Sequence, residues 1–496
     1  MSKLIKARRD KELATNKKRH SKKVKNDFDK SNFFVKNKDL ILRIVFTFFV
    51  LVIIRAGMYL TVPGVTIDQK AMSDAQGMDF FQLMSTLGGG SIGKFSILAL
   101  GVSPYITASI IVQLLSTDVI PVLTNWAKSG ERGRKKLDRL TKVLMIPFAI
   151  MQAEATVFTL ANMKSADGKS VINLAWETAG SQVGMAPAAF YYVLIPLIML
   201  AGSYLMLWIA DQITVRGVGN GISIIIFLGI ITTFPNNFKS SFQYWIPSMH
   251  ESAGILFSGI IKFVIYVVVF LLVIFFVVLM NEAERKIPIQ QTGSGLVKTE
   301  DYTPYLPLKL NNAGVIPVIF ASAIISTPIT IAQIVRAGSP NSGFVKFCDN
   351  VLSFGSWWGI AIYAVLTIAF TFLYAQVQIN PEKIAENFKK SGTFIPGIKP
   401  GKDTSKFLAG TINRLSIIGS LFLAIIAVLP YIISKITGLP SQFAIGGTGL
   451  IICISVAIQT IQQLKGRVIQ QSFIDKKKQK FGDKQVMEQE RESHIW

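Results

Sequence analysis

Long runs of apolar residues are the feature that most constrains how this chain can fold. The segment from Gly254 to Met280 contains a single charged residue, Lys262. No core helix of a soluble protein needs so long an apolar run, whereas a helix that crosses a bilayer needs about 20 such residues. Half of the 496 residues are hydrophobic, and most charged residues lie between the runs. The chain is therefore predicted to cross a membrane several times.

Ten apolar segments predict an all-α polytopic membrane protein with ten transmembrane helices. The fifth is only 14 residues long, so hydropathy supports it least. In chain order the segments are Leu40–Leu60, Ile97–Leu115, Val143–Ala161, Pro187–Ile209, Asn220–Thr233, Ile255–Met280, Ala313–Ile334, Trp357–Ile379, Leu415–Ile433 and Ala444–Leu464.

The distribution of lysine and arginine predicts how the spans are oriented. Fourteen of these residues precede Arg43, seven lie in 116–142, four in 281–312, six in 380–410, and eight from Lys465 onward. The alternate loops are poorer in positive charge. Because positively charged loops stay in the cytoplasm, both termini are expected there, as basic tails at residues 1–39 and 465–496. Two cytoplasmic termini require an even number of spans, which supports ten.

Ten spans divide into an N-terminal half, residues 40–234, and a C-terminal half, residues 235–464. Since five is odd, the second half is expected to be inverted relative to the first, with pseudo-symmetry between them. Inverted repeats tend to place a functional path at their interface. Glycine and proline interrupt the second span of both halves, at Gly101–Pro104 and Gly314–Pro317. We therefore expect a path between these two helices.

The apolar segment at residues 79–90 is too short to cross a bilayer and ends in three glycines. Two structures fit this pattern. The segment can fold back into a cavity as a short, movable re-entrant helix, or it can lie on the outer face as an interfacial helix. The pattern favours neither.

Catalytic and ion-coupling groups are sparse in the predicted spans. Glu154 is the deepest carboxylate and has no oppositely charged partner nearby in sequence, so a position facing a water-filled cavity is favoured. Secondary transporters usually bury several titratable groups. Motifs for nucleotide binding, hydrolysis or zinc binding are absent, and the two cysteines lie far apart. We therefore expect no enzyme activity, no cofactor and no metal site.

Isoleucines recur at helical spacing in two spans. Ile106 and Ile110 lie on one helix face, as do Ile222 and Ile226. Such residues in membrane helices usually pack against neighbours or face lipid. A ring of them can instead close a pore by excluding water, which blocks ions without a binding site.

Two loops expected on the cytoplasmic side, residues 281–312 and 380–410, are long, basic and interrupted by glycine and proline. Ordinary positive-inside bias explains their charge but not their length. Docking of a large anionic partner explains both.

Several ordered motifs resemble the SecY family of protein-secretion channels, over about Leu40 to Gly466. The matching stretches are ALGVSPYITASIIVQLL at 99–115, RGVGNGISIIIF at 216–227, ERKIP at 284–288, AGVIPVIFAS at 313–322, NPEK at 380–383 and GGT at 446–448. Lys399 stands where the family usually has arginine, and Glu154 where bacterial members usually have an apolar residue.

This resemblance implies roles for specific residues. A plug would close the outer funnel, a pore ring would form the waist, and polar residues would line a lateral gate between the second and third helices on one side and the seventh and eighth on the other. The implied plug residues are Phe80, Phe81, Leu83, Met84, Leu87, Gly88, Gly89 and Gly90. The implied pore ring is Ile106, Ile110, Ile222, Ile226, Ile319 and Ile452. The implied gate residues are Thr107, Ser109, Gln152 and Asn311.

The resemblance also implies partners and a place in the cell. The two basic loops would dock the SecA motor ATPase or the ribosome, including its RNA and proteins. The docking residues would be Arg285, Lys286, Lys389, Lys390, Lys399 and Lys402. SecE and SecG would be companion subunits in the bacterial cytoplasmic membrane, and signal peptides, nascent chains and membrane lipids would contact the channel. The function implied is conduction of unfolded secretory proteins and lateral release of transmembrane segments.

Three alternatives remain open at the level of sequence. A secondary transporter for a small solute would show paired charges near the middle of the membrane. An accessory secretion channel, serving few substrates, would share the motifs. A membrane enzyme would need a catalytic constellation.

Overall fold

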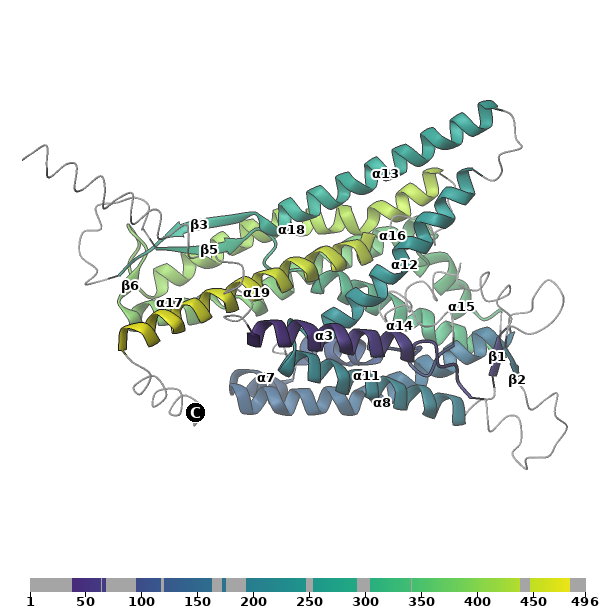
Figure 1. The fold of residues 1–496 in the computed structure, drawn as a ribbon, viewed down its shortest axis with the longest axis horizontal. Helices are drawn as coiled ribbons and strands as arrows, with labels where there is room; N and C mark the ends of the chain where they lie inside the picture. Colours follow the sequence, from purple (N-terminus) through teal and green to yellow (C-terminus); the bar gives the residue numbers. More distant parts are fainter. Residues whose placement is uncertain are drawn as a thin grey trace, which may run out of the picture.

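The computed structural model describes residues 38–63, 65–67, 95–116, 120–162, 172–174, 193–246, 253–291, 304–339, 341–437 and 447–481. Across these residues the chain forms a bundle of long helices with short strand pairs at both ends (Figure 1). Strands β3, β5 and β6 lie at one end of the bundle, and β1 and β2 lie at the other. The predicted plug, residues 79–90, lies outside the described residues.

The helices up to and including the one that spans the predicted boundary of the halves are α3 (Lys38–Gly57), α6 (Ser103–Ser116), α7 (Pro121–Lys128), α8 (Glu131–Asn162), α11 (Ile195–Arg216) and α12 (Gly221–Trp245). The later helices are α13 (Ala253–Glu282), α14 (Ile316–Gly338), α15 (Gly343–Phe347), the π-helical turn η4 (Cys348–Leu352), α16 (Trp357–Gln378), α17 (Pro381–Ser391), α18 (Lys402–Thr437) and α19 (Gly447–Phe481).

The strands form two-stranded antiparallel pairs. Strand β1 (Val65–Ile67) pairs with β2 (Ile172–Leu174), and β3 (Glu284–Pro288) pairs with β5 (Tyr305–Lys309). Strand β4 (Gln290–Gln291) pairs with β6 (Thr393–Phe394). The last pair joins the two basic loops, which are far apart in the sequence.

The number of spans agrees with the sequence. Among the described residues, nine helices are long and apolar enough to cross a membrane. A tenth span results if α6 and α7, which meet at an angle of 101°, form one bent span. With 14 residues, α6 covers only about 21 Å of the roughly 30 Å hydrocarbon core. The second span is therefore irregular, at the place where glycine and proline interrupt its sequence.

The fifth span is not short, which corrects the expectation of 14 residues. Helix α12 has 25 residues and runs through Asn236 and Asn237. The side chain of Asn220 caps it by accepting hydrogen bonds from the backbone of Ile222 and Ser223. Its later turns are held by aromatic contacts with α13, such as Phe238 against Phe270 at 4.9 Å between ring centroids. The predicted boundary of the halves, at residues 234 and 235, falls inside this helix.

Other helices extend beyond the apolar segments that predicted them. Helix α8 begins at Glu131, before the predicted start at Val143, and α18 begins at Lys402 rather than Leu415. The predicted C-terminal tail begins inside α19, which continues to Phe481. Helix α11 is shifted toward the C-terminus relative to the predicted fourth span. Hydropathy marks the apolar stretch, whereas backbone hydrogen bonds continue into polar sequence.

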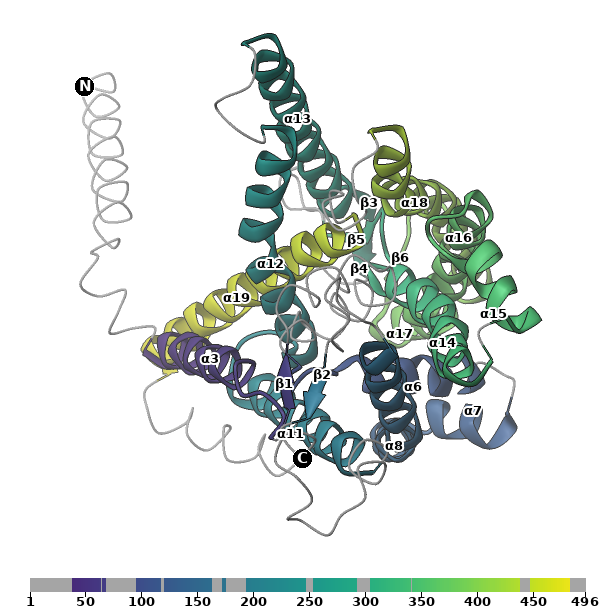
Figure 2. The same ribbon diagram turned by 90° about the vertical axis from the view of Figure 1, so that its right-hand side faces the viewer.

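Helix α14 belongs to the second half of the chain and packs against α6 and α8 of the first half. We call this contact the seam. Helix α14 contacts α6 and α8 on one side and α16 on the other, and α16 also packs against α18. Helix α12 contacts α11, α13 and α19. In the view of Figure 2, along the bundle, α6 and α8 lie beside α14, and α12 and α19 cross near the middle. The helices that carry the predicted pore residues therefore lie around the centre, where α6 contacts α14 and α12 contacts α19.

Candidate functional site

Two helices begin in the same way near the centre of the bundle. Gly101 has a φ of 55° and precedes Pro104 in the first turn of α6, while Gly314 has a φ of 65° and precedes Pro317 in the first turn of α14. Glycine adopts a positive φ readily, and proline is favoured in a first helical turn because its nitrogen needs no partner there. The two interruptions noted in the sequence are thus equivalent helix starts.

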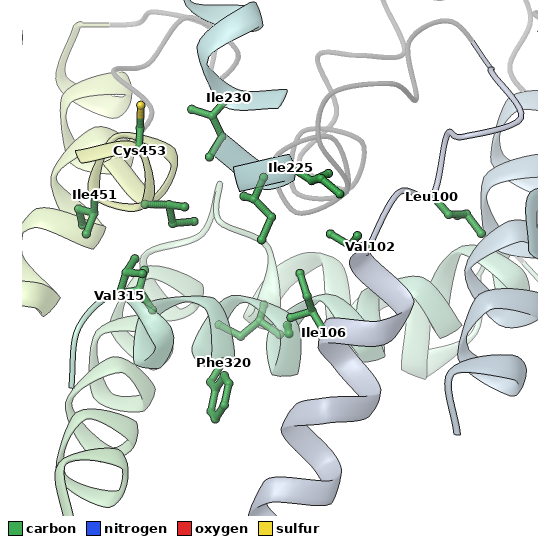
Figure 3. Packing of buried hydrophobic residues seen from close by; sticks show 14 of the residues in the cluster. Leu100, Val102, Ile106, Ile225, Ile230, Val315, Phe320, Ile451 and Cys453 are labelled. Atoms are coloured by element: carbon green, nitrogen blue, oxygen red, sulfur yellow. The ribbon is translucent and has the colours of Figure 1, made fainter. Parts of the chain in front are cut away.

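The predicted pore isoleucines belong to one apolar cluster. Ile106, Ile110, Ile226 and Ile452 are buried in it, and Ile222 and Ile319 are partly buried and pack against it. The structure adds neighbours that sequence reasoning missed, and Figure 3 shows Val102, Ile106 and Ile225 directed into the same centre, with Val315 and Ile451 nearby. Val102 could have been found from its position four residues before Ile106. No acidic or basic side chain is buried among the described residues.

Two of the predicted gate residues contact each other. The side-chain amide of Gln152, in α8, donates to the hydroxyl of Thr107, in α6, over 3.5 Å. The Thr107 hydroxyl donates in turn to the carbonyl of Ser103. Both side chains are buried, and the Oε1 atom of Gln152 has no hydrogen-bond partner among the described residues. The pair links α6 to α8 by one long hydrogen bond between neutral groups.

Asn311 belongs to a different network. Its Nδ2 donates to Oδ1 of Asn281 over 3.4 Å, and the hydroxyl of Ser455 donates to the same oxygen. This network joins the end of α13, the segment before α14 and helix α19. Ser109 accepts from Gln113 within α6. In the part of the chain that the structure describes, no hydrogen bond connects Asn311 with Thr107, Ser109 or Gln152.

The contact of α14 with α6 and α8 is free of hydrogen bonds among the described residues. The buried hydroxyls of α14 bond within their own helix: Ser326 donates to the carbonyl of Ala323, and Thr330 to that of Ser326. In α8, Thr156 donates to the carbonyl of Gln152. Side-chain hydroxyls satisfied in this way need no partner across the interface, so within the described residues packing holds α14 against α6 and α8.

A cluster of charged residues between α6, α8 and α11 was not predicted from the sequence. Lys142, in α8, lies 3.1 Å from carboxylate oxygens of both Asp138 and Asp211. Tyr105, in α6, donates to Asp138 over 3.3 Å, and Tyr204 donates to the backbone carbonyl of Lys142. The cluster ties α6, α8 and α11 together, so these helices form one unit on their side of the seam. Only the tertiary structure brings these residues together.

The two basic loops form one folded platform. The β4–β6 pair connects them, and an apolar cluster lies beneath, separate from the central one. Its buried members are Ile287, Leu308, Ile395, Leu408, Ile412 and Leu415. Helix α17 is well capped, since the side chain of Asn380 accepts from two backbone amides and Gly392 ends the helix with a φ of 63°. This platform consists of β3–β6, α17 and the first turns of α18.

All six predicted docking residues are exposed on the platform. Lys286 lies 3.6 Å from Glu284 and above the ring of Tyr305. Lys390 lies 2.8 Å from Glu386, and this ammonium group lowers the pKa of the Glu386 carboxyl. The other four cations, Arg285, Lys389, Lys399 and Lys402, form no ion pair among the described residues.

Lys399 stands at the tip of a tight turn. Gly397 and Gly401 flank it with φ values of 82° and 104°, which favour glycine. Its backbone carbonyl accepts a hydrogen bond of 2.9 Å from the hydroxyl of Thr404. The turn therefore presents one ammonium group on a fixed backbone. This arrangement suits electrostatic recognition of an anionic surface.

Relatives of known name match nearly the whole chain. A sequence model of the SecY family matches residues 96–461. The chain is 68% identical over 476 residues to protein translocase subunit SecY of Mycoplasma capricolum subsp. capricolum, with 96% of each chain covered. It is 39% identical over 442 residues to the subunit of the same name in Streptococcus sanguinis, with 88% of this chain and 96% of the relative covered.

Solved structures share the fold at low sequence identity. One is described as the structure of a protein conducting channel. It matches with a TM-score of 0.61 and 18% sequence identity, and the match covers 87% of this chain and 93% of the chain in that structure. Another, described as Sec61 in the canine ribosome-channel complex from the endoplasmic reticulum, has a TM-score of 0.59 and 17% identity, with the same coverage. These matches confirm the predicted all-α membrane fold. The expectation of a channel subunit and not an enzyme is confirmed by the family: this chain belongs to the SecY family of protein translocase subunits.

Proposed function

We propose that this chain is the central channel subunit of a bacterial protein translocase, which conducts unfolded secretory proteins across the membrane and releases transmembrane segments sideways into the bilayer. The observation that carries the proposal is the uncharged, isoleucine-rich centre, built by side chains from α6, α12, α14 and α19. Membership of the SecY family supports the same function.

The proposed pore ring consists of Ile106, Ile110, Ile222, Ile226, Ile319 and Ile452. An ion that entered this waist would lose its water shell and gain no ligand, because the lining is aliphatic. A polypeptide, in contrast, can displace the same side chains as it passes, since aliphatic contacts have no preferred direction. The ring would thus seal around a moving chain and close when it leaves, and residues 79–90 would act as the plug.

The proposed lateral gate is the seam where α14 meets α6 and α8. Opening this seam breaks packing contacts but no hydrogen bond among the described residues. A translocating segment that is apolar enough gains about 0.3–0.6 kcal/mol for each central leucine, isoleucine, phenylalanine or valine that enters the bilayer. Such a segment leaves sideways, whereas a polar one continues through the pore. The chain itself carries out no covalent chemistry.

The platform is the proposed docking surface for SecA or for the ribosome. Its unpaired cations Arg285, Lys389, Lys399 and Lys402 face solvent, and the platform core holds them on one rigid unit. The proposed orientation places the platform and both termini in the cytoplasm of a bacterial cell. SecE and SecG are proposed as small companion subunits.

Reconstitution tests the proposed function directly. Vesicles that contain the full chain, its copurifying subunits and SecA should protect a secretory precursor from added protease when ATP is supplied. Two unrelated precursors should both be protected, because an accessory channel would accept only one kind. Absence of protection despite bound SecA would contradict the proposal, and accumulation of a small solute instead would favour a transporter.

A further inference from the structure

A short helical segment between α14 and α16 has no role in the function proposed above. Helix α15 continues into η4 at the end of the bundle opposite the platform (Figure 1). The hydroxyl of Ser342 caps it by accepting from the backbone of Val345. Figure 2 shows α15 at the rim of the bundle, outside α14.

One face of this segment is fixed to α14. Val345 and Cys348 are buried against Ala332 and Val335. The thiol of Cys348 donates to the carbonyl of Pro328 over 3.8 Å. Arg336, in the last turns of α14, forms an ion pair with Asp349. Segment 343–352 therefore lies alongside the final turns of a membrane-spanning helix and not beyond its end.

A second, exposed face carries two large apolar side chains. Phe344 is 42% exposed and Phe347 is 53% exposed, and a spacing of three places them on one helix face. Phenylalanine is usually buried in a water-soluble protein. Lys346 lies between them in the sequence and is also exposed.

Neighbouring residues mark the depth of the membrane boundary. Helix α16 has 22 residues, or about 33 Å, close to the roughly 30 Å of the hydrocarbon core. Its first residues, Trp357 and Trp358, are 61% and 71% exposed. The ammonium of Lys435, at the end of α18, lies 4.3 Å from the ring of Trp357. Tryptophan and lysine are typical of the boundary between acyl chains and headgroups.

We propose that α15 and η4 form an interfacial lipid anchor, with Phe344 and Phe347 inserted between the acyl chains and headgroups of the leaflet away from the platform. The occupant of the exposed face is lipid. The final turns of α14, against which the segment packs, also expose Ile331, and the end of α18 exposes Ile436. Lys346 and Lys435 favour anionic headgroups at this level.

Spin labelling measures the depth of this face. A nitroxide is attached to Phe347→Cys, or to Glu382→Cys as the control at an exposed position of α17 on the platform, in full-length chain with Cys348→Ala and Cys453→Ala. The proteins are reconstituted, with copurifying subunits, in vesicles of phosphatidylcholine and phosphatidylglycerol. Because oxygen concentrates in acyl chains and a nickel chelate stays in water, collisions with oxygen should prevail at Phe347→Cys. The ratio should be reversed at the exposed Glu382→Cys.

Other outcomes overturn the proposal. If the nitroxide at Phe347→Cys collides with the nickel chelate as often, relative to oxygen, as the nitroxide of the control does, the face lies in water. Shielding from both reagents would mean that a protein covers it. If the variant without native cysteines does not fold, Phe347→Trp in the natural background gives the same answer. Brominated lipid should then quench its added fluorescence more than that of Glu382→Trp on the platform, and equal quenching would refute the anchor.

Discussion

In the proposed function, aliphatic residues at the centre of the bundle hold back ions when no polypeptide is passing. Ile106 and Ile110 of α6, Ile226 of α12 and Ile452 of α19 are buried in one apolar cluster, and no acidic or basic side chain is buried among the described residues. A single hydroxyl in such a site gives water a partner, and water gives an ion its shell. The barrier should therefore depend on individual side chains.

Replacing two of these isoleucines should make the channel leak. Ile106→Ser together with Ile226→Ser adds hydroxyls to the waist, so the ion conductance of reconstituted vesicles should rise well above that of the natural chain. The matched control is Ile418→Ser, because Ile418 is an exposed side chain of α18. Equal conductance in the two variants would contradict the pore ring.

A second prediction at the residue scale concerns Lys399 at the tip of its glycine-flanked turn. Lys399→Glu should weaken binding of SecA or of ribosomes, and the loss should shrink as salt rises, because exposed charges are screened. Lys239→Glu makes the same charge change on α12, away from the platform. Binding curves at several salt concentrations provide the measurement, and a loss of the same size in both variants would argue against specific docking by Lys399.

At the scale of elements, helix α14 differs from its neighbours in the kind of contacts that hold it to α6 and α8. Its contact with α6 and α8 has no hydrogen bond in the described part of the chain, whereas α6, α8 and α11 are tied by Lys142 and its two carboxylates. The side with the ion pairs should stay together when the seam separates. Gln152 bears on the stability of the contact between α14 and α8, because its buried Oε1 atom has no hydrogen-bond partner in the part of the chain that the structure describes.

Substitution of Gln152 should stabilise the closed gate. A buried polar atom without a partner costs about 1–3 kcal/mol, and Gln152→Leu removes it while keeping a similar volume. Precursors with weakly apolar signal sequences should then be translocated less, and those with strongly apolar ones should be unaffected. Gln463→Leu, at an exposed position of α19, is the control. An equal effect on both classes of precursor would be evidence against a gating role.

The platform should unfold locally without disturbing the channel. Leu408 is fully buried in the platform core, and its neighbour Phe407 is 37% exposed. Leu408→Ala should cost about 2–5 kcal/mol through lost burial and the cavity it leaves. Hydrogen exchange should then accelerate in β3–β6 but not in α16. If Phe407→Ala accelerates exchange as strongly, the apolar cluster is not what holds the two loops together.

The whole molecule exposes apolar surface that its own helices do not cover. Helix α13 contacts only α12 and α19 among the larger helix contacts, and many of its side chains, such as Phe275 and Leu271, are exposed. Lipid or another membrane subunit must cover this surface in the cell.

Purification from membranes in mild detergent should therefore yield a complex. We expect a small protein of one or a few spans to accompany the chain in stoichiometric amount, as identified by mass spectrometry of the intact complex. Full translocation activity by vesicles that contain the chain and SecA alone would contradict the need for companion subunits.

The sequence by itself determined the membrane fold, the number of spans and the residues proposed for the waist, because these follow from local properties. An apolar run long enough to cross a bilayer has few alternatives to a helix, and the motifs that carry the family resemblance are contiguous in the chain. Helix ends were less predictable: α12 continues through polar residues because aromatic contacts with α13 hold its later turns.

Only the tertiary structure decided which distant residues meet. It joined the two basic loops through β4 and β6, placed Asn311 beside Asn281 and Ser455 instead of Gln152, and assembled the cluster around Lys142. Hydropathy and spacing describe one helix at a time, and they contain no information on how neighbouring helices are rotated and shifted against each other. Those relations arise from side-chain packing over the whole bundle.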